Sequence, residues 1–334
     1  MVVGKKIRIV YMGTPEFAVA PLERLVKEGY DIAAVVTVPD KPAGRGLKSC
    51  ESDVKKFAIA NNLTVLQPSL LKEPLFIESL KELKADLFIV VAFRMLPKIV
   101  WSMPPMGTFN LHGSLLPQYR GAAPINWAII NGEQKSGVTT FMLDEKIDTG
   151  AILLQKECTI DKEETVGTLY DKLMVMGADL VAETVEGVTT GSLTPKTQQY
   201  RDTKPLNEAP KITKEICRIN WNRPAEELER LIRGLSPYPG TSTKMSFNNK
   251  SIEVKIFNAR AINNNPGLTG QDSDQKNPIR ERVGSIISDG KSTLQVVCKE
   301  SILSITEIQI AGKRKMKIGE FLAGFREAEN YLFE

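Results

Sequence analysis

Histidine is almost absent from this chain: a single residue, His112, occurs among 334. Zinc sites that need several histidines and other His-rich metal clusters are therefore excluded, and any chemistry that needs an imidazole has to use His112. The four cysteines, Cys50, Cys158, Cys217 and Cys298, are too widely spaced for a metal-binding pair or a disulfide framework. We therefore expect free thiols and no bound metal.

Long apolar runs are missing as well. No stretch of about 18 apolar residues occurs, so the sequence predicts no membrane-spanning helix. The N-terminus leads directly into a strand-like run, Lys6–Met12, and lacks the apolar core of a signal peptide. We expect a cytoplasmic monomer. Its 42% apolar and 25% charged residues are typical of a soluble globular chain, here one long enough for two domains.

Strand-like and helix-like segments alternate through the first part of the chain. Ile32–Val38 and Ala85–Phe93 are continuous apolar runs, as buried parallel strands require. Thr14 and Pro15 suit the start of a helix that ends at Gly29. We expect an α/β fold with a Rossmann-like, mostly parallel sheet and flanking helices. The first strand–helix turn is not Gly-x-Gly-x-x-Gly, so a dinucleotide site lacks its best support.

The last third of the chain has a different pattern. Residues 194–212 are polar and contain several prolines, which predicts a linker between a catalytic domain, 1–193, and a second domain, 213–334. Short strand-like segments in the second domain predict a small β-barrel of the oligonucleotide-binding (OB) type. The whole net charge of +4 lies in residues 208–334. That asymmetry weakly favours an anionic partner.

The strongest candidate for chemistry lies in Thr108–Gly121. Asn110 and His112 are two residues apart on an expected strand, so their side chains share one side of it. We place His112 near the carboxyl end of this strand, where open α/β sheets bind ligands. An amide and an imidazole can hold and protonate an oxygen on which negative charge develops. The alternative is an ordinary histidine that bonds a backbone carbonyl.

A tight acidic loop, Asp144–Gly150, follows a later strand. Asp144, Glu145 and Asp148 offer a thin ligand set for a hard cation. A carboxylate that orients His112 is the better interpretation of this loop.

A second unusual loop, Pro39–Lys48, places Lys41, Arg45 and Lys48 among Gly and Pro residues. Such a loop is either a solvated connection or a basic finger that contacts phosphates. The residues alone favour neither interpretation.

Several motifs resemble a known family. Asn110–Pro117, Arg120–Pro124 and Asp148–Gly150 resemble the active-site signature of formyltransferases that use 10-formyltetrahydrofolate. The resemblance narrows to the methionyl-tRNA formyltransferase family through a further set of motifs: Gly13–Ala18, Lys41–Gly46, Tyr170–Leu173, Ala209–Ile212, Ile219–Trp221 and Ala311–Lys315. Each motif is weak alone, but together they are specific and cover essentially the whole chain.

The resemblance implies an enzyme that passes a formyl group from 10-formyltetrahydrofolate, as co-substrate, to the α-amino group of methionyl initiator tRNA. The product is the N-formylmethionyl-tRNA used in translation initiation. By family analogy Asn110 donates to the developing oxyanion, His112 stabilises it and supplies a proton, and Asp148 fixes the imidazole. No covalent enzyme intermediate is needed, in agreement with the lack of a serine or cysteine nucleophile motif.

The resemblance also implies two binding surfaces. The folate pocket is expected to be lined by Met95, Leu96, Ser114, Leu115, Leu116 and Pro117. The tRNA is expected to contact Lys41, Arg45, Lys48, Lys211, Lys313, Arg314 and Lys315. Where the family often has Tyr-Gly, this chain has Phe93-Arg94, which is expected to change the rim of the pocket. The loop Asn263–Asn277 is longer than usual, is expected to be disordered, and has no role that we can assign.

Two other functions compete. A folate-dependent formyltransferase that acts on an amino-sugar nucleotide would share Asn110, His112 and Asp148. A non-catalytic RNA-binding protein would keep only the basic surfaces. The basic insert and the cationic C-terminal domain argue against the first, and the intact set of three polar residues argues against the second.

Overall fold

The computed structural model describes residues 7–43, 48–199, 205–262 and 282–334. The chain divides into two compact units. The first unit comprises residues 1–124, 135–159 and 170–210, and the second comprises 125–134, 160–169 and 211–334. In the described parts of the chain, no helix has both the length and the apolar character that crossing a membrane requires. The loop Asn263–Asn277 and Arg45 lie outside the described residues.

The first unit is built on a seven-stranded sheet with the order β10-β9-β7-β6-β1-β2-β5. Its strands are β1 (Arg8–Gly13), β2 (Asp31–Val36), β5 (Val65–Leu66), β6 (Leu87–Val91), β7 (Thr108–His112), β9 (Lys135–Met142) and β10 (Ile152–Thr159). All pairs from β7 to β5 are parallel, whereas β9 and β10 are added antiparallel. The expected Rossmann-like, mostly parallel sheet is confirmed.

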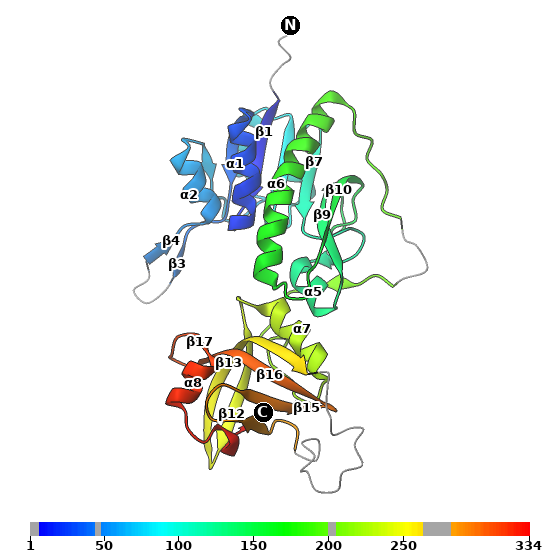
Figure 1. Cartoon of the computed structure of the whole chain (residues 1–334). Helices are drawn as coiled ribbons and strands as arrows, with labels where there is room; N and C mark the ends of the chain where they lie inside the picture. The colour runs from blue at the N-terminus through cyan, green and yellow to red at the C-terminus, as the bar shows by residue number, and fades with distance from the viewer. Residues whose placement is uncertain (1–6, 44–47, 200–204, 263–281) are drawn as a thin grey trace. The chain divides into compact units, whose positions relative to one another are not determined.

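Helices cover this sheet because its strands are apolar on both sides. They are α1 (Val19–Lys27), α2 (Asp53–Ala60), α3 (Pro74–Glu82), α4 (Lys98–Trp101) and α6 (Val166–Thr190). Helices α1 and α6 lie side by side on one face (Figure 1), joined by an Arg24–Asp179 ion pair of 3.1 Å. Gly177 of α6 lies so close to β7 that a Cβ there would be 2.8 Å from Leu111. Because side chains alternate along a strand, Asn110 and His112 point to the other side.

Two local predictions were wrong. Thr14 does not cap the first helix: a short 3-10 turn, η1 (Glu16–Ala18), comes first, and the Ala18 N–H donates to Pro15 O at 2.9 Å. The basic loop at residues 39–48 contains a hairpin formed by β3 (Lys41–Ala43) and β4 (Lys48–Cys50). Ladder hydrogen bonds between Lys41–Ala43 and Lys48–Cys50 satisfy backbone groups of these two strands, although one of them contains Pro42. Figure 1 shows the hairpin extending away from α2.

The second unit is a small antiparallel barrel, as predicted. Its strands are β12 (Thr241–Phe247), β13 (Lys250–Ile262), β14 (Ile286–Ser288), β15 (Leu294–Cys298), β16 (Ser301–Ile310), β17 (Met316–Lys317) and β18 (Leu332–Phe333). The sheet order β14-β15-β16-β13-β12-β18 is closed by a bridge between Ser285 and Leu332. The two-residue turn between β12 and β13 consists of Asn248 and Asn249, both with positive φ, as tight hairpin turns require.

The second unit also contains helices. These are α5 (Pro124–Ile130), α7 (Ala225–Leu235), α8 (Ile318–Gly324) and the 3-10 turn η3 (Ala328–Asn330). Leu228 and Ile232 of α7 are fully buried in the barrel core. The Asn126 amide in α5 donates to Gly234 O at the end of α7, at 2.8 Å. Burial of such an apolar helix stripe is the main stabilising force of a small barrel domain.

Candidate active site

Strand β7 carries two of the predicted catalytic residues. Asn110 lies opposite Val90 of β6 and Phe141 of β9, and His112 lies opposite Thr139. Asn110 is half-buried, whereas His112 is 6% exposed. Within the described parts of the chain no group bonds the Asn110 amide, so its N–H groups are available to an incoming oxygen.

The imidazole of His112 is held at one nitrogen. Its Nε2 lies 2.8 Å from the backbone oxygen of Tyr119. Because a carbonyl oxygen only accepts, Nε2 carries the proton of this bond and Nδ1 is the nitrogen left for proton exchange. The Phe141 ring packs edge-on against the imidazole, with centroids 6.4 Å apart. The bond to a backbone carbonyl that marks an ordinary histidine is therefore present, but it occupies only Nε2.

The other nitrogen faces Asp148. Asp148 Oδ2 lies 3.8 Å from His112 Nδ1 and accepts a hydrogen bond from the Gly121 N–H at 2.9 Å. Asp148 has a left-handed φ of 54°, which is strained for a residue with a side chain. Gly150 lets the loop pass close to β9, because a Cβ there would lie 1.6 Å from Met142 O.

The remaining acids of this loop point elsewhere. Asp144 accepts hydrogen bonds from the Lys146 N–H and the Thr149 hydroxyl, which shape the loop itself. Glu145 forms an exposed ion pair with Lys98 at 2.5 Å, and this pair holds the pKa of Glu145 below its usual value. Among the described residues no cluster of three metal-ligating side chains occurs. Of the three acids, only Asp148 lies next to the imidazole.

The turn after β7 contains four of the residues expected to line the folate pocket. The Ser114 hydroxyl donates to Gln118 O at 2.7 Å, and Thr139 Oγ1 donates to Ser114 O at 2.6 Å. The Gln155 amide donates to Leu116 O at 2.9 Å. Leu116 is buried, whereas Leu115 and Pro117 are half-buried. The turn is therefore rigid, and Leu115 and Pro117 are its partly exposed apolar members.

The two residues expected on the other wall differ from each other. Met95 is 72% exposed, whereas Leu96 is buried in the core beside Phe88 and Val100. Leu96 has little surface to offer a ligand. The neighbouring Arg94 donates to Pro68 O and Ser69 O at 2.8 and 3.0 Å, so its guanidinium is committed to a loop. Burial lowers the pKa of Arg94.

The segment expected to be a linker contributes to this site. Glu208–Ala209 forms the short strand β11, which pairs with β8 (Arg120–Gly121), and the Tyr119 N–H donates to Asn207 O at 2.7 Å. Gln198 is buried and bonds the acidic loop. Sequence reasoning missed both contacts, because a polar, Pro-bearing stretch has no periodicity that reveals a long-range partner.

The residues expected to contact tRNA are exposed wherever the structure describes their side chains. Lys41, at the start of β3, and Lys211 are exposed. In the barrel unit, Arg314 pairs with Glu320 at 2.6 Å and Lys315 pairs with Glu307 at 2.9 Å. Lys313, in the turn between β16 and β17, is also exposed. Of the hairpin cations, Arg45 lies outside the described residues, and Lys48 is described only as the first residue of β4.

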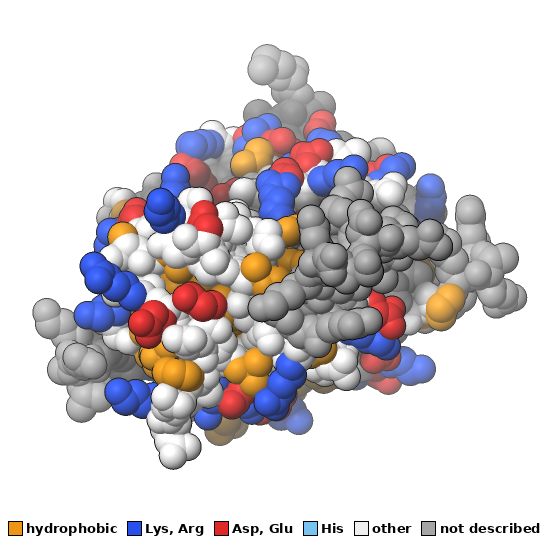
Figure 2. Space-filling model, turned by 60° about the horizontal axis from the view of Figure 1, so that its bottom comes forward, with side chains coloured by type: hydrophobic (Ala, Val, Ile, Leu, Met, Phe, Trp, Pro, Cys, Tyr) orange, Lys and Arg blue, Asp and Glu red, His pale blue; other side chains and the backbone are white. Residues whose placement is uncertain are grey.

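Charges of both signs are mixed on the surface. On the face shown in Figure 2, Lys and Arg side chains are interspersed with Asp and Glu, so the part that is not grey lacks a uniform cationic field. We therefore expect individual barrel cations to contribute modestly to anion binding.

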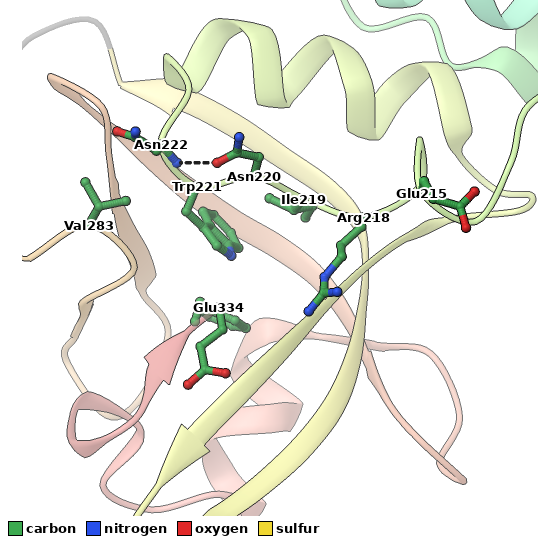
Figure 3. A pocket seen from close by; sticks show the side chains of 9 residues that line it. Glu215, Arg218, Ile219, Asn220, Trp221, Asn222, Val283 and Glu334 are labelled. Atoms are coloured by element: carbon green, nitrogen blue, oxygen red, sulfur yellow. Dashed lines mark hydrogen bonds between the residues drawn. The ribbon is translucent and has the colours of Figure 1, made fainter.

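The barrel unit also has a hollow of about 490 Å³ that the sequence did not indicate. It is lined by Glu215, Arg218, Ile219, Asn220, Trp221, Asn222, Val283, Phe333 and Glu334 (Figure 3). Trp221 packs on Phe333 with ring centroids 5.1 Å apart, and its indole N–H donates to Thr243 Oγ1 at 2.9 Å. None of the residues predicted from the sequence to act in catalysis or binding lines this hollow.

Comparison with known proteins now decides the family. The family described as formyl transferase matches residues 5–185, and the family described as formyl transferase, C-terminal domain, matches residues 211–326. The methionyl-tRNA formyltransferase of Bacteroides thetaiotaomicron is 46% identical over 327 residues, which cover 97% of this chain and 98% of that protein. The chain belongs to the methionyl-tRNA formyltransferase family. It is therefore a formyl-transferring enzyme.

Other relatives agree. The methionyl-tRNA formyltransferase of Parabacteroides distasonis is 47% identical over 331 residues, covering 97% of this chain and 98% of the relative. That of Flavobacterium johnsoniae is 46% identical over 320 residues, covering 96% of each protein.

Solved structures share the fold of the enzyme. WlaRD, a sugar 3N-formyl transferase studied with dTDP and 5-N-formyl-THF, has a TM-score of 0.61 at 21% identity and covers 93% of this chain and 100% of that one. HypX from Aquifex aeolicus, in complex with tetrahydrofolic acid, has a TM-score of 0.59 at 19% identity and covers 97% of this chain and 48% of that one. At these identities the likeness establishes the fold alone.

Proposed function

We propose that the enzyme transfers the formyl group of 10-formyltetrahydrofolate to the α-amino group of methionyl initiator tRNA, giving N-formylmethionyl-tRNA. The observation that carries the proposal is the pair formed by the buried His112 and the half-buried Asp148, 3.8 Å apart, with Asn110 on the same side of β7. Relatives of 46–47% identity that are named for this reaction support the acceptor. Solved folds studied with folate compounds support the donor.

The reaction forms one C–N bond and breaks another. The neutral α-amine attacks the formyl carbon, the carbonyl oxygen becomes an oxyanion, and the bond to the folate N10 then breaks as a proton reaches N10. The available Asn110 amide donates to the oxyanion, which is the role that its position on β7, two residues before His112, supports. One such donor is typically worth about 10²–10³ in rate.

His112 exchanges the proton. Because Nε2 donates to Tyr119 O, Nδ1 is the nitrogen that takes the proton lost by the amine and returns it to N10. The Asp148 carboxylate stabilises the positive charge that the ring acquires on the way. Asp148 keeps its orientation through the Gly121 N–H. No step needs a covalent bond to the enzyme.

The proposal keeps the expected division of the binding surfaces. We assign the folate to the turn Ser114–Pro117 and to the exposed Met95, and catalysis to residues 1–193. The tRNA is assigned to Lys41, Arg45 and Lys48 of the insert, and to the linker and barrel cations Lys211, Lys313, Arg314 and Lys315. The proposal locates the reaction in the cytoplasm, where tRNA is charged and used. The monomeric state stays a prediction.

An acceptor assay tests the proposal. The enzyme is mixed with a radiolabelled formyl donor and, separately, with methionyl initiator tRNA and with an amino-sugar nucleotide. We expect labelled N-formylmethionyl-tRNA and no labelled sugar. Formylation of the sugar alone would contradict the proposal and favour a formyltransferase that acts on an amino-sugar nucleotide. A solved sugar formyltransferase with the same fold makes this the alternative to test. A purely RNA-binding role is already excluded by membership of a formyl-transferring family.

A further inference from the structure

Gln198 has an unusual environment for a residue in an expected linker. It is 5% exposed, although its neighbours Thr197 and Gln199 are exposed. Its amide nitrogen donates to Asp148 O at 2.9 Å and to Gly150 O at 2.8 Å. Its amide oxygen accepts from Arg120 Nη2 at 2.5 Å. Both N–H groups and the carbonyl of the side chain are therefore bonded.

These contacts bracket the residue that faces His112. The carbonyls on both sides of the Asp148–Gly150 turn are held by the same amide. Asp148 is in a left-handed conformation, φ 54°, which a residue with a Cβ keeps only when the surroundings enforce it. Within the acidic loop, the Lys146 N–H and the Thr149 hydroxyl donate to Asp144, and the Thr149 hydroxyl also lies 3.3 Å from Lys146 O.

The same side chain reaches the second support of Asp148. Arg120, which donates to Gln198, precedes Gly121, whose N–H holds Asp148 Oδ2 at 2.9 Å. Gln198 thus links the acidic loop to the β8 strand in a closed ring of hydrogen bonds. A shift of either segment moves the carboxylate relative to His112 Nδ1.

We propose that Gln198 is a positioning residue for formyl transfer, which acts by holding Asp148 at its distance from His112. The inference rests on the proposed roles of Asp148 and His112. Gln198 itself contacts neither the imidazole nor a substrate in this scheme; its amide fixes the backbone that carries the carboxylate. Loss of such support can lower kcat by up to about 10²-fold when the catalytic groups are displaced by about 1 Å.

The first test compares Gln198→Leu with Gln199→Leu, a neighbouring exposed glutamine that serves as a matched control. We expect kcat for formyl transfer to fall by about 10–100-fold in Gln198→Leu, with KM for the formyl donor within about threefold of the parent. Gln199→Leu keeps both constants within about twofold. Equal kcat values for the parent and folded Gln198→Leu would overturn the proposal.

A second variant separates the two ends of the amide. Gln198→Glu keeps an acceptor for Arg120 but loses both donors to the acidic loop at neutral pH. We expect it to be as slow as Gln198→Leu. Parent-like activity of Gln198→Glu would show that the two hydrogen bonds to the Asp148 and Gly150 carbonyls are dispensable, and would overturn the proposal.

A double-mutant cycle with Asp148→Asn distinguishes positioning from general stabilisation. If Gln198 acts through Asp148, Gln198→Leu slows the Asp148→Asn enzyme by no more than about threefold, compared with about 10–100-fold in the parent. Multiplicative losses would overturn the proposal. The parent reaction is measured first with methionyl-tRNA, so a parent that does not formylate it refutes the proposed function, whereas an active parent with an unaffected Gln198→Leu refutes only this inference.

Discussion

The His112 site and the barrel cations (Lys313, Arg314 and Lys315) show two ways in which polar residues are arranged. The imidazole of His112 is 7% exposed and bonded at Nε2, and Asp148 beside it is fixed by the Gly121 N–H. The barrel cations are exposed, and two of them are paired with Glu307 and Glu320. In the first region hydrogen bonds hold the imidazole and the carboxylate in place, whereas in the second the charges are exposed and are screened by salt. Single changes should therefore have large effects in the first region and small effects in the second.

The largest effect is expected at His112. Replacing it with alanine removes both the Nδ1 proton carrier and the packing on Phe141, and kcat should fall by at least ~100-fold. The measurement is steady-state formylation at saturating tRNA. A rate within a few-fold of the parent would show that the imidazole is not catalytic and would remove the contrast between the two regions.

The next largest effect is expected at Asp148. Asparagine in its place can still accept the Gly121 hydrogen bond but carries no charge beside Nδ1, so kcat should fall by about 10–100-fold. Glu145→Gln is the matched control in the same loop, because Glu145 makes only an exposed pair with Lys98 and its loss should leave kcat within about twofold. Similar losses in both variants would indicate a general effect of the loop instead of one carboxylate.

A backbone change tests how tightly the site is built. Gly121 has a φ of 122°, and a Cβ there would lie 2.6 Å from Ala209 O, so Gly121→Ala has to separate β8 from β11. We expect a loss of about 1–3 kcal/mol in the free energy of unfolding, together with a lower kcat. Thermal or urea unfolding measures the first and formylation the second.

The control for this change is Gly191→Ala. Gly191 also has a positive φ, 70°, but apart from its chain neighbours no atom of the described residues lies within 4 Å of a new Cβ. The free energy of unfolding of Gly191→Ala should fall by only about 1 kcal/mol, the cost of the backbone conformation, and its kcat should not change. Equal losses of unfolding free energy and of kcat in the two variants would show that the close approach of β8 and β11 contributes to neither.

Much of the site was predicted because its signals are local. The apolar run Ala85–Phe93 gave the central strand β6 (Leu87–Val91), and the two-residue spacing correctly placed Asn110 and His112 on one side of β7. The resemblance to the formyltransferase signature singles out Asp148 among the three acids of its loop, and the structure puts it 3.8 Å from His112 Nδ1.

The rest depended on contacts that no local pattern contains. Gln198 bonds Arg120 and Asp148, which are 78 and 50 residues away in the chain. The Gly and Pro residues of Pro39–Lys48 predict a loop, although the structure pairs Lys41–Ala43 with Lys48–Cys50. Pairing across a turn overrides weak local propensity.

The smallest effects are expected in the barrel. Lys313→Ala should raise KM for tRNA by about two- to threefold and flatten its dependence on salt concentration. Lys315→Ala should do less, because Glu307 at 2.9 Å and the Phe257 ring already engage that ammonium group. Titrations at several salt concentrations measure both. A kcat loss of about 100-fold in either variant, as large as that expected for His112→Ala, would contradict the division between the two regions.

The most direct test of this division measures two quantities, the single-turnover rate with saturating tRNA and the Kd for methionyl-tRNA, in two variants. His112→Ala should lose at least ~100-fold in rate and keep its Kd within about twofold. The double variant Lys211→Ala/Lys313→Ala should bind tRNA about 5–10-fold more weakly and keep its saturated rate within about twofold. If each variant lost rate and affinity together, catalysis and tRNA binding would not reside in separate regions, and the account would be wrong.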